Sequence, residues 1–175
     1  IAEGGTVDEA VRLTHTIEDR LKPFLADGTV GSYESILTYL PLAERQREVI
    51  AAVHEQEHAA FDPVRIQGTL RAALSENGFR EDAFSAYLDQ LGRFLAPARP
   101  IMLDDLERNG LGRIVERYVH RDANRVQIVT YLYTSDPRWR RNPPPGLVEA
   151  LQANDAGIVV TGTNVVGREL RQIFL

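Results

Sequence analysis

One motif in the sequence could do chemistry directly: His54-Glu55-Gln56-Glu57-His58. On a helix, two histidines four positions apart share a face and can chelate Zn²⁺, while the glutamate between them acts as general base on the bound water. A catalytic zinc site also needs a third protein ligand in an apolar surround. Glu76 and Glu81 are candidates for that ligand only because of their distance along the sequence. In addition, Glu57 puts a charge where apolar packing is needed. We therefore expect a solvated helix face without bound metal, and a zinc hydrolase built on His54, Glu55 and His58 is the weakest alternative.

Two further polar segments could bind a ligand. Arg138-Trp139-Arg140-Arg141, followed by a proline-rich stretch, could stack a base or hold a lipid head group. Since prolines mainly stiffen such loops, we expect a rigid connection with solvated arginines, with membrane or partner contact as the alternative. Thr161-Gly162-Thr163-Asn164 lies between a strand and a helix, where backbone amides could receive an anion. It has no nucleotide-binding glycine pattern, so a turn capped by Thr163 or Asn164 is predicted.

Composition narrows the class of protein. With 25 acidic and 20 basic residues the formal charge is −5, which gives a nucleic-acid backbone no broad attractive surface. The absence of cysteine excludes a disulfide scaffold and a thiol nucleophile, and no serine lies in a G-x-S-x-G motif. No apolar run approaches the ~20 residues that cross a bilayer. We predict a soluble, non-enzymatic fragment without a cofactor.

Residues 1–41 have the signals of a strand end, a helix and a strand. Thr6-Val7-Asp8-Glu9 has the form of a capping box that opens a helix. An apolar stripe follows at three- and four-residue steps, and Asp27-Gly28 supplies the stop. The stripe consists of Ala10, Leu13, Ile17, Leu21 and Phe24. The β-branched and aromatic composition of residues 29–35 predicts a short strand.

Residues 122–175 repeat this pattern. We predict a strand over residues 125–134, a short helix over 147–153, a strand over 158–161 and a final helix from Asn164. Residues 42–121 are helical in pattern and are predicted to be an insertion. The expected fold is α+β, a ferredoxin-like split β-α-β sandwich interrupted by helices, in which residues 126–134 pair with residues 29–35, 158–161 or both.

Several ordered segments resemble the extracytoplasmic loops of the RND superfamily, and more narrowly those of the MMPL-type lipid exporters. They are residues 28–35 (GTVGSYES), 39–41 (YLP), a helix opened by Gln46, 74–79 ending in NGF, 126–136 and 158–162 (IVVTG). Each motif is short, and the resemblance lies in their order along nearly the whole chain. In that family the last helix of the loop enters a transmembrane helix, which would account for the apolar residues Ile173-Phe174-Leu175.

The resemblance implies a periplasmic porter domain of a proton-motive-force-driven inner-membrane exporter of lipids or other hydrophobic molecules. Its partners would be the transmembrane helices and second periplasmic loop of the same polypeptide, with a homo-oligomer possible. The proton-relay carboxylates of such exporters lie in membrane helices, so none is assigned here. A cleft between the α/β layer and the helical insertion would pass the lipid, and its candidate lining residues, equally suited to a core, are Phe79, Phe84, Tyr87 and Phe94. The alternative is a free-standing periplasmic ligand-binding or adaptor domain.

Overall fold

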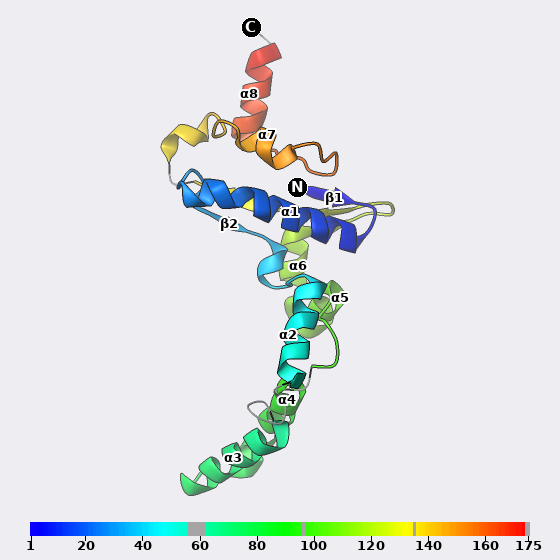
Figure 1. Ribbon diagram of the computed structural model, residues 1–175, viewed down its shortest axis with the longest axis vertical. Coiled ribbons are helices and arrows are strands. Elements are labelled where there is room, and N and C mark those ends of the chain that lie inside the picture. Colours follow the sequence, from blue (N-terminus) through cyan, green and yellow to red (C-terminus); the bar gives the residue numbers. More distant parts are fainter. Residues whose placement is uncertain (56–61, 96, 135, 174–175) are drawn as a thin grey trace. The chain divides into compact units, whose positions relative to one another are not determined.

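The computed structural model describes residues 1–55, 62–95, 97–134 and 136–173 (Figure 1). The chain divides into two compact units. The α/β unit comprises Ile1–Leu42 and Leu103–Leu175, and the helical unit comprises Ala43–Met102. The helical unit is thus shorter than the predicted insertion over residues 42–121. Residues 103–121 belong instead to the α/β unit because their apolar side chains, such as Leu103 and Tyr118, are buried in its core.

The strands of the α/β unit form two small antiparallel sheets. The first has the order β1-β4-β3, from Ala2–Gly4, Val126–Ile128 and Val119–Arg121 respectively. The second pairs β2 (Ser32–Glu34) with β5 (Tyr131–Tyr133). The fold is therefore α+β, as predicted. The expected pairing of residues 126–134 with residues 29–35 is confirmed, since Tyr33 lies opposite Leu132.

Two strand predictions were wrong in detail. The single strand expected over residues 125–134 is two strands in different sheets. They part where the Val129 amide donates to the Tyr118 carbonyl at 2.8 Å, beyond the end of the β3–β4 ladder. The strand expected over residues 158–161 is reduced to one bridge between Ala2 and Ile158. This segment still follows β1, because the Val159 amide donates to the Ile1 carbonyl at 2.9 Å.

Helix α1 (Val7–Ala26) begins at the predicted capping box. Thr6 Oγ1 accepts from the Glu9 amide at 3.2 Å, and the Glu9 carboxylate accepts from the Gly5 amide at 2.8 Å. Its apolar face packs across β1 and β4, where Ala10, Ile17 and Leu21 are buried together with Ala2 and Ile128. The helix ends at Ala26 with Asp27 as its C-cap, and Gly28 adopts a φ of +75°, which glycine does without a Cβ clash.

Shorter helices complete the α/β unit. They are η1 (Ile36–Thr38), α5 (Leu103–Leu106), the π-helical η3 (Glu107–Leu111), α6 (Gly112–Tyr118), η4 (Pro137–Arg140), α7 (Leu147–Gln152) and α8 (Thr163–Ile173). The chain turns between α5 and α6 at the predicted Asn109-Gly110, where Gly110 has a φ of +84°. Helices α7 and α8 were both predicted, α7 as residues 147–153 and α8 from Asn164.

The helical unit contains α2 (Ala43–Glu55), α3 (Pro63–Glu76), η2 (Glu81–Phe84) and α4 (Ser85–Leu95). The Asp62 side chain caps α3 by accepting from the Val64 and Arg65 amides. Among the residues described in this unit, Leu74 and Leu88 are the buried apolar side chains, and α2 contributes none. In the described part of the whole chain, no helix has both the length and the apolar character required to cross a membrane.

Glu18 gives the α/β unit a pH-dependent contribution to stability. Its carboxylate on α1 accepts from the buried Ser35 hydroxyl. Burial raises the pKa of Glu18 above the usual 4.5, and the hydrogen bond from Ser35 opposes the shift. A raised folded-state pKa means that the folded chain holds the proton more tightly than the unfolded chain. Stability is therefore lost as the pH rises from about 4.5 through the folded-state pKa.

The substitution Glu18→Gln is expected to remove this loss, because glutamine carries no charge and its amide oxygen can still accept from Ser35. The free energy of unfolding of the variant, minus that of the parent protein, should therefore be larger at pH 7 than at pH 4. Urea denaturation at both pH values measures this difference. Glu116→Gln, at an exposed position on α6, is the matched control and should show no such gain. An equal difference between Glu18→Gln and the parent at both pH values would contradict the assignment.

Candidate functional site

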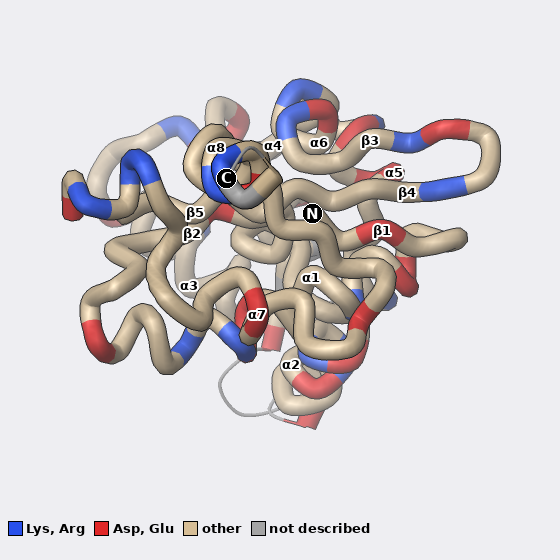
Figure 2. Tube along the Cα trace, turned by 90° about the horizontal axis from the view of Figure 1, so that it is seen from above, with Lys and Arg blue, Asp and Glu red and all other residues tan. Residues whose placement is uncertain are grey.

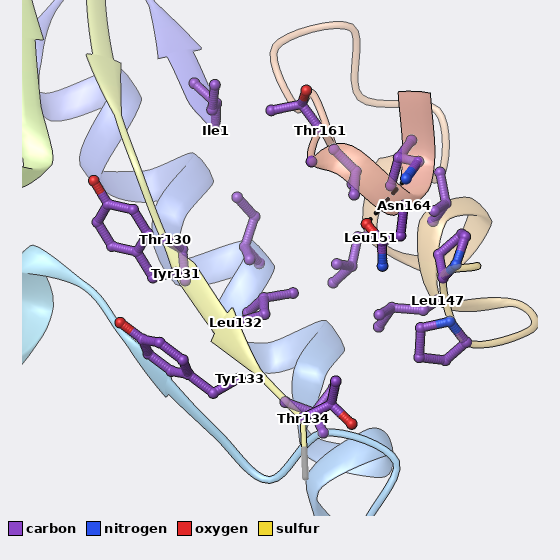
Figure 3. Close-up of a pocket in the computed structure, with 18 of the residues that line it drawn as sticks. Ile1, Thr130, Tyr131, Leu132, Tyr133, Thr134, Leu147, Leu151, Thr161 and Asn164 are labelled. Carbon is purple, nitrogen blue, oxygen red and sulfur yellow. Dashed lines mark hydrogen bonds between the residues drawn. The ribbon is translucent and has the colours of Figure 1, made fainter. Parts of the chain in front are cut away.

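A largely apolar pocket of about 390 Å³ lies within the α/β unit (Figure 3). One wall is the segment from Val129 to Thr134, which includes β5. The opposite wall comes from α7, the residues around Ile158 and the start of α8. Ile17 of α1 also lines it. Its aliphatic and proline side chains are Ile1, Ile17, Val30, Val129, Leu132, Pro143, Pro144, Leu147, Val148, Leu151, Ile158, Val160 and Val165.

Local sequence features orient the side chains on both walls. Successive side chains of a strand point to opposite faces, so Leu132 lies on the pocket side of β5 while the rings of Tyr131 and Tyr133 point away from it (Figure 3). On the other wall, α7 presents Leu147 and Leu151, which are both buried. The pocket is thus lined by an amphipathic strand and an amphipathic helix that face each other.

Arg20 ties the pocket wall formed by α7 to α1. Its guanidinium donates to the Leu151 carbonyl at 2.7 Å and to the Ala153 carbonyl at 3.4 Å, and it forms an ion pair with Asp155. The Arg20 side chain is 25% exposed, so these bonds are only partly screened by water. This residue was not identified from the sequence. The only local signal was a basic residue on α1 and an acidic one after α7, and nothing in the sequence pairs them.

The pocket contains few polar groups. Thr134 Oγ1 accepts from the Asp136 amide at 3.2 Å, and the Asn164 side chain donates to the Trp139 carbonyl at 2.9 Å. Thr130 Oγ1 is the one buried side-chain oxygen or nitrogen in the described residues that has no hydrogen-bond partner. No lining residue has a carboxylate, imidazole, ammonium or guanidinium side chain. Such a surface can hold an apolar ligand.

The two tyrosines that point away from the pocket belong to a polar cluster on the outer face of β2 and β5. The Glu34 carboxylate accepts from Tyr118 at 3.3 Å, from Tyr133 at 3.2 Å and from Arg117 at 2.6 Å. The Arg117 guanidinium also lies 5.6 Å from the centre of the Tyr131 ring. Burial raises the pKa of Tyr118. These groups satisfy one another, so we interpret the cluster as structural.

The residues of the candidate zinc motif are only partly described. His54 and Glu55 lie at the exposed end of α2, whereas Gln56, Glu57 and His58 lie outside the described residues. Within residues 1–55, 62–95, 97–134 and 136–173, no group of three or more histidine, aspartate or glutamate side chains could hold a metal ion. The expectation that the motif binds no metal stays a prediction.

The aromatic residues named as candidate lining residues do not line this pocket. Phe79, Phe84, Tyr87 and Phe94 all belong to the helical unit, and Phe79 packs edge-on against Phe84 with ring centres 6.1 Å apart. The residues around Gly162 do contribute. Asn164 Oδ1 accepts from the Val165 amide where α8 begins, and Thr161, Gly162 and Asn164 line the pocket.

No known protein family, curated protein or solved structure matches the chain. The geometry and chemistry of the pocket are thus the basis for assigning a function.

Proposed function

We propose that the chain is a periplasmic porter domain of a proton-motive-force-driven inner-membrane exporter, similar to the MMPL branch of the RND superfamily, and that its pocket receives part of a lipid or another hydrophobic molecule. The observation that carries this proposal is the pocket itself, which is lined by aliphatic side chains and free of charged ones. A binding function without catalysis fits that lining better than an enzymatic function does.

The strand pairings support the ferredoxin-like arrangement expected of such a domain. Ile158 bridges to β1, β1 pairs with β4, and β2 pairs with β5, all in the antiparallel sense. If β4 and β5 are treated as one interrupted strand, and β3, which pairs with the other edge of β4, is left aside, the spatial order is Ile158, β1, β4–β5, β2. This is the order of a split β-α-β fold in which α1 connects β1 to β2 and α7 connects β5 to Ile158.

The size of the pocket favours a hydrophobic ligand that enters with one segment. Its 390 Å³ is near the lower end of the volumes of small-molecule sites, so it suits part of an acyl chain or a polycyclic ring system. Each methylene buried there would contribute about 0.8 kcal/mol of binding free energy. The unpartnered hydroxyl of Thr130, a lining residue, could supply a hydrogen bond to a polar atom of such a ligand.

Filling the pocket is expected to weaken binding. Thr161 is exposed and lines the pocket, so Thr161→Trp should place an indole in its mouth and lower the affinity for a fluorescent fatty acid by about tenfold or more, a loss of ~1.4 kcal/mol. Thr163→Trp is the matched control, since Thr163 is exposed and does not line the pocket. Equal binding by both variants, or no binding of the fatty acid by the parent protein, would contradict the assigned site.

The exporter proposal itself is tested on the complete gene. We expect apolar spans of ~20 residues to flank the region encoding this chain, and a topology reporter fused after Leu175 to place the chain on the periplasmic side of the inner membrane. Polar flanking sequence or a cytoplasmic reporter signal would reject the exporter. The same pocket would then favour the alternative, a free-standing ligand-binding or adaptor domain.

A further inference from the structure

Thr130 has a hydroxyl group that no described residue pairs with. The residue immediately precedes β5 and lines the pocket, as Leu132 does two residues later, while the Tyr131 ring between them points away (Figure 3). Its Oγ1 is shielded from solvent and has no hydrogen-bond partner in the described part of the chain. A buried hydroxyl without a partner destabilises a folded chain, so a bound molecule that pairs with it gains affinity.

The other polar side chains of the lining are uncharged as well. Apart from the two tyrosines that point outward, they are Thr134, Thr161 and Asn164. The Asn164 side chain is already engaged, since it donates to the Trp139 carbonyl and accepts from the Val165 amide. Figure 2 colours the charged residues along the chain, and none of them belongs to the lining. An ionised group inside the pocket would therefore lose its hydration without gaining a counter-ion from the lining side chains.

We propose that the pocket selects an uncharged lipid that carries a hydroxyl or carbonyl oxygen, and that Thr130 determines this specificity. On binding, the Thr130 hydroxyl turns toward the oxygen of the lipid, as the staggered rotamers of threonine allow, and forms a hydrogen bond with it. The aliphatic lining receives the hydrocarbon part of the molecule. This inference rests on the proposed binding of a hydrophobic molecule, and it adds the polar group by which that molecule is recognised.

1-Decanol and decanoate test the specificity, because they have the same number of carbon atoms and differ in charge. Each competes with a fluorescent fatty acid at pH 7.5, where decanoate is ionised. Decanoate can enter only with its methyl end, which leaves the Thr130 hydroxyl unpaired. Ile1 also lines the pocket, so its amino group is acetylated and adds no positive charge. We expect the parent chain to bind decanol at least about tenfold more tightly than decanoate.

Two substitutions of Thr130 separate specificity from a structural role. Thr130→Val nearly keeps the shape and removes the hydroxyl, so it should weaken the binding of decanol by about tenfold and leave that of decanoate unchanged. Thr130→Ser keeps the hydroxyl and should retain the preference for decanol. Thr163→Val, at an exposed position outside the lining, is the matched control and should bind both compounds as the parent does.

The stability of the free chain gives an independent measurement. Because Thr130→Val removes a buried hydroxyl that has no partner, its midpoint of urea unfolding should equal or exceed that of the parent chain. A lower midpoint would show that the hydroxyl is already bonded in the free chain, and it would overturn the inference.

The titrations distinguish a failure of this inference from a failure of the proposed function. If the parent chain binds none of the three compounds, the pocket is not a binding site and both proposals are rejected. If the fluorescent fatty acid binds, three results reject the specificity alone. They are a failure of decanol to compete, an affinity for decanoate as high as that for decanol, and an equal loss of both ligands in Thr130→Val.

Discussion

Replacement of Gly157 with alanine is expected to lower the free energy of unfolding of the α/β unit by about 3 kcal/mol. A Cβ at this position would lie 2.7 Å from the Glu3 carbonyl oxygen and 2.7 Å from the Leu13 side chain. The first clash is with the backbone of β1, which cannot move without losing the hydrogen bond from the Glu3 amide to the Gly157 carbonyl. Urea denaturation followed by circular dichroism measures the loss.

Gly167→Ala is the control for this prediction. Gly167 lies in α8, and a Cβ added there would have no neighbouring atom within 4 Å, so alanine should be neutral or stabilise the helix by up to about 1 kcal/mol. Similar unfolding curves for Gly157→Ala and the parent protein would show that β1 and the segment before Ile158 do not approach as closely as described.

The second large effect is expected from Arg20→Met, which should lower the free energy of unfolding by about 2 kcal/mol. Methionine keeps much of the aliphatic length but removes every hydrogen bond that the guanidinium makes, leaving the Leu151 carbonyl and the Asp155 carboxylate without this partner. Because α7 forms one wall of the pocket, the affinity for a fluorescent fatty acid should fall in parallel.

Arg12→Met separates this effect from a general loss of positive charge on α1. Arg12 is exposed on the same helix, and its substitution should change the free energy of unfolding by less than about 0.5 kcal/mol. If the two variants were equally stable, the bonds from Arg20 to the end of α7 would contribute nothing measurable.

The sequence predicted best those elements whose signals are local. Helix α1 carries its capping box, its apolar stripe and its Asp27-Gly28 stop within one continuous segment, and all three appear in the structure. The starts of helices α7 and α8 are also marked locally, since each helix begins after a turn that contains glycine. Hydrogen bonds between near neighbours set these boundaries, so the pattern of residue types is sufficient to place them.

The sheets were harder to predict because their limits depend on partners far away in the sequence. Strand β3 was missed, since α6 passes into it at Tyr118 and Val119 without a glycine or proline to mark the change. No glycine or proline marks the division between β4 and β5 either. The pocket depends on segments that run from Ile1 to Val165, and no local pattern could assemble them.

The discontinuous α/β unit has a consequence for how the protein is made. Ala2 pairs with Ile128 and forms a bridge with Ile158. Neither contact can form until the ribosome has synthesised the chain as far as the second residue. The helical unit is one continuous stretch, residues 43–102, and can form in the meantime. Helix α1 would leave the ribosome with its apolar face exposed. We therefore expect chaperones to bind the nascent chain until the residues near 158 have left the exit tunnel. Contacts between residues so far apart in the sequence also favour slow folding.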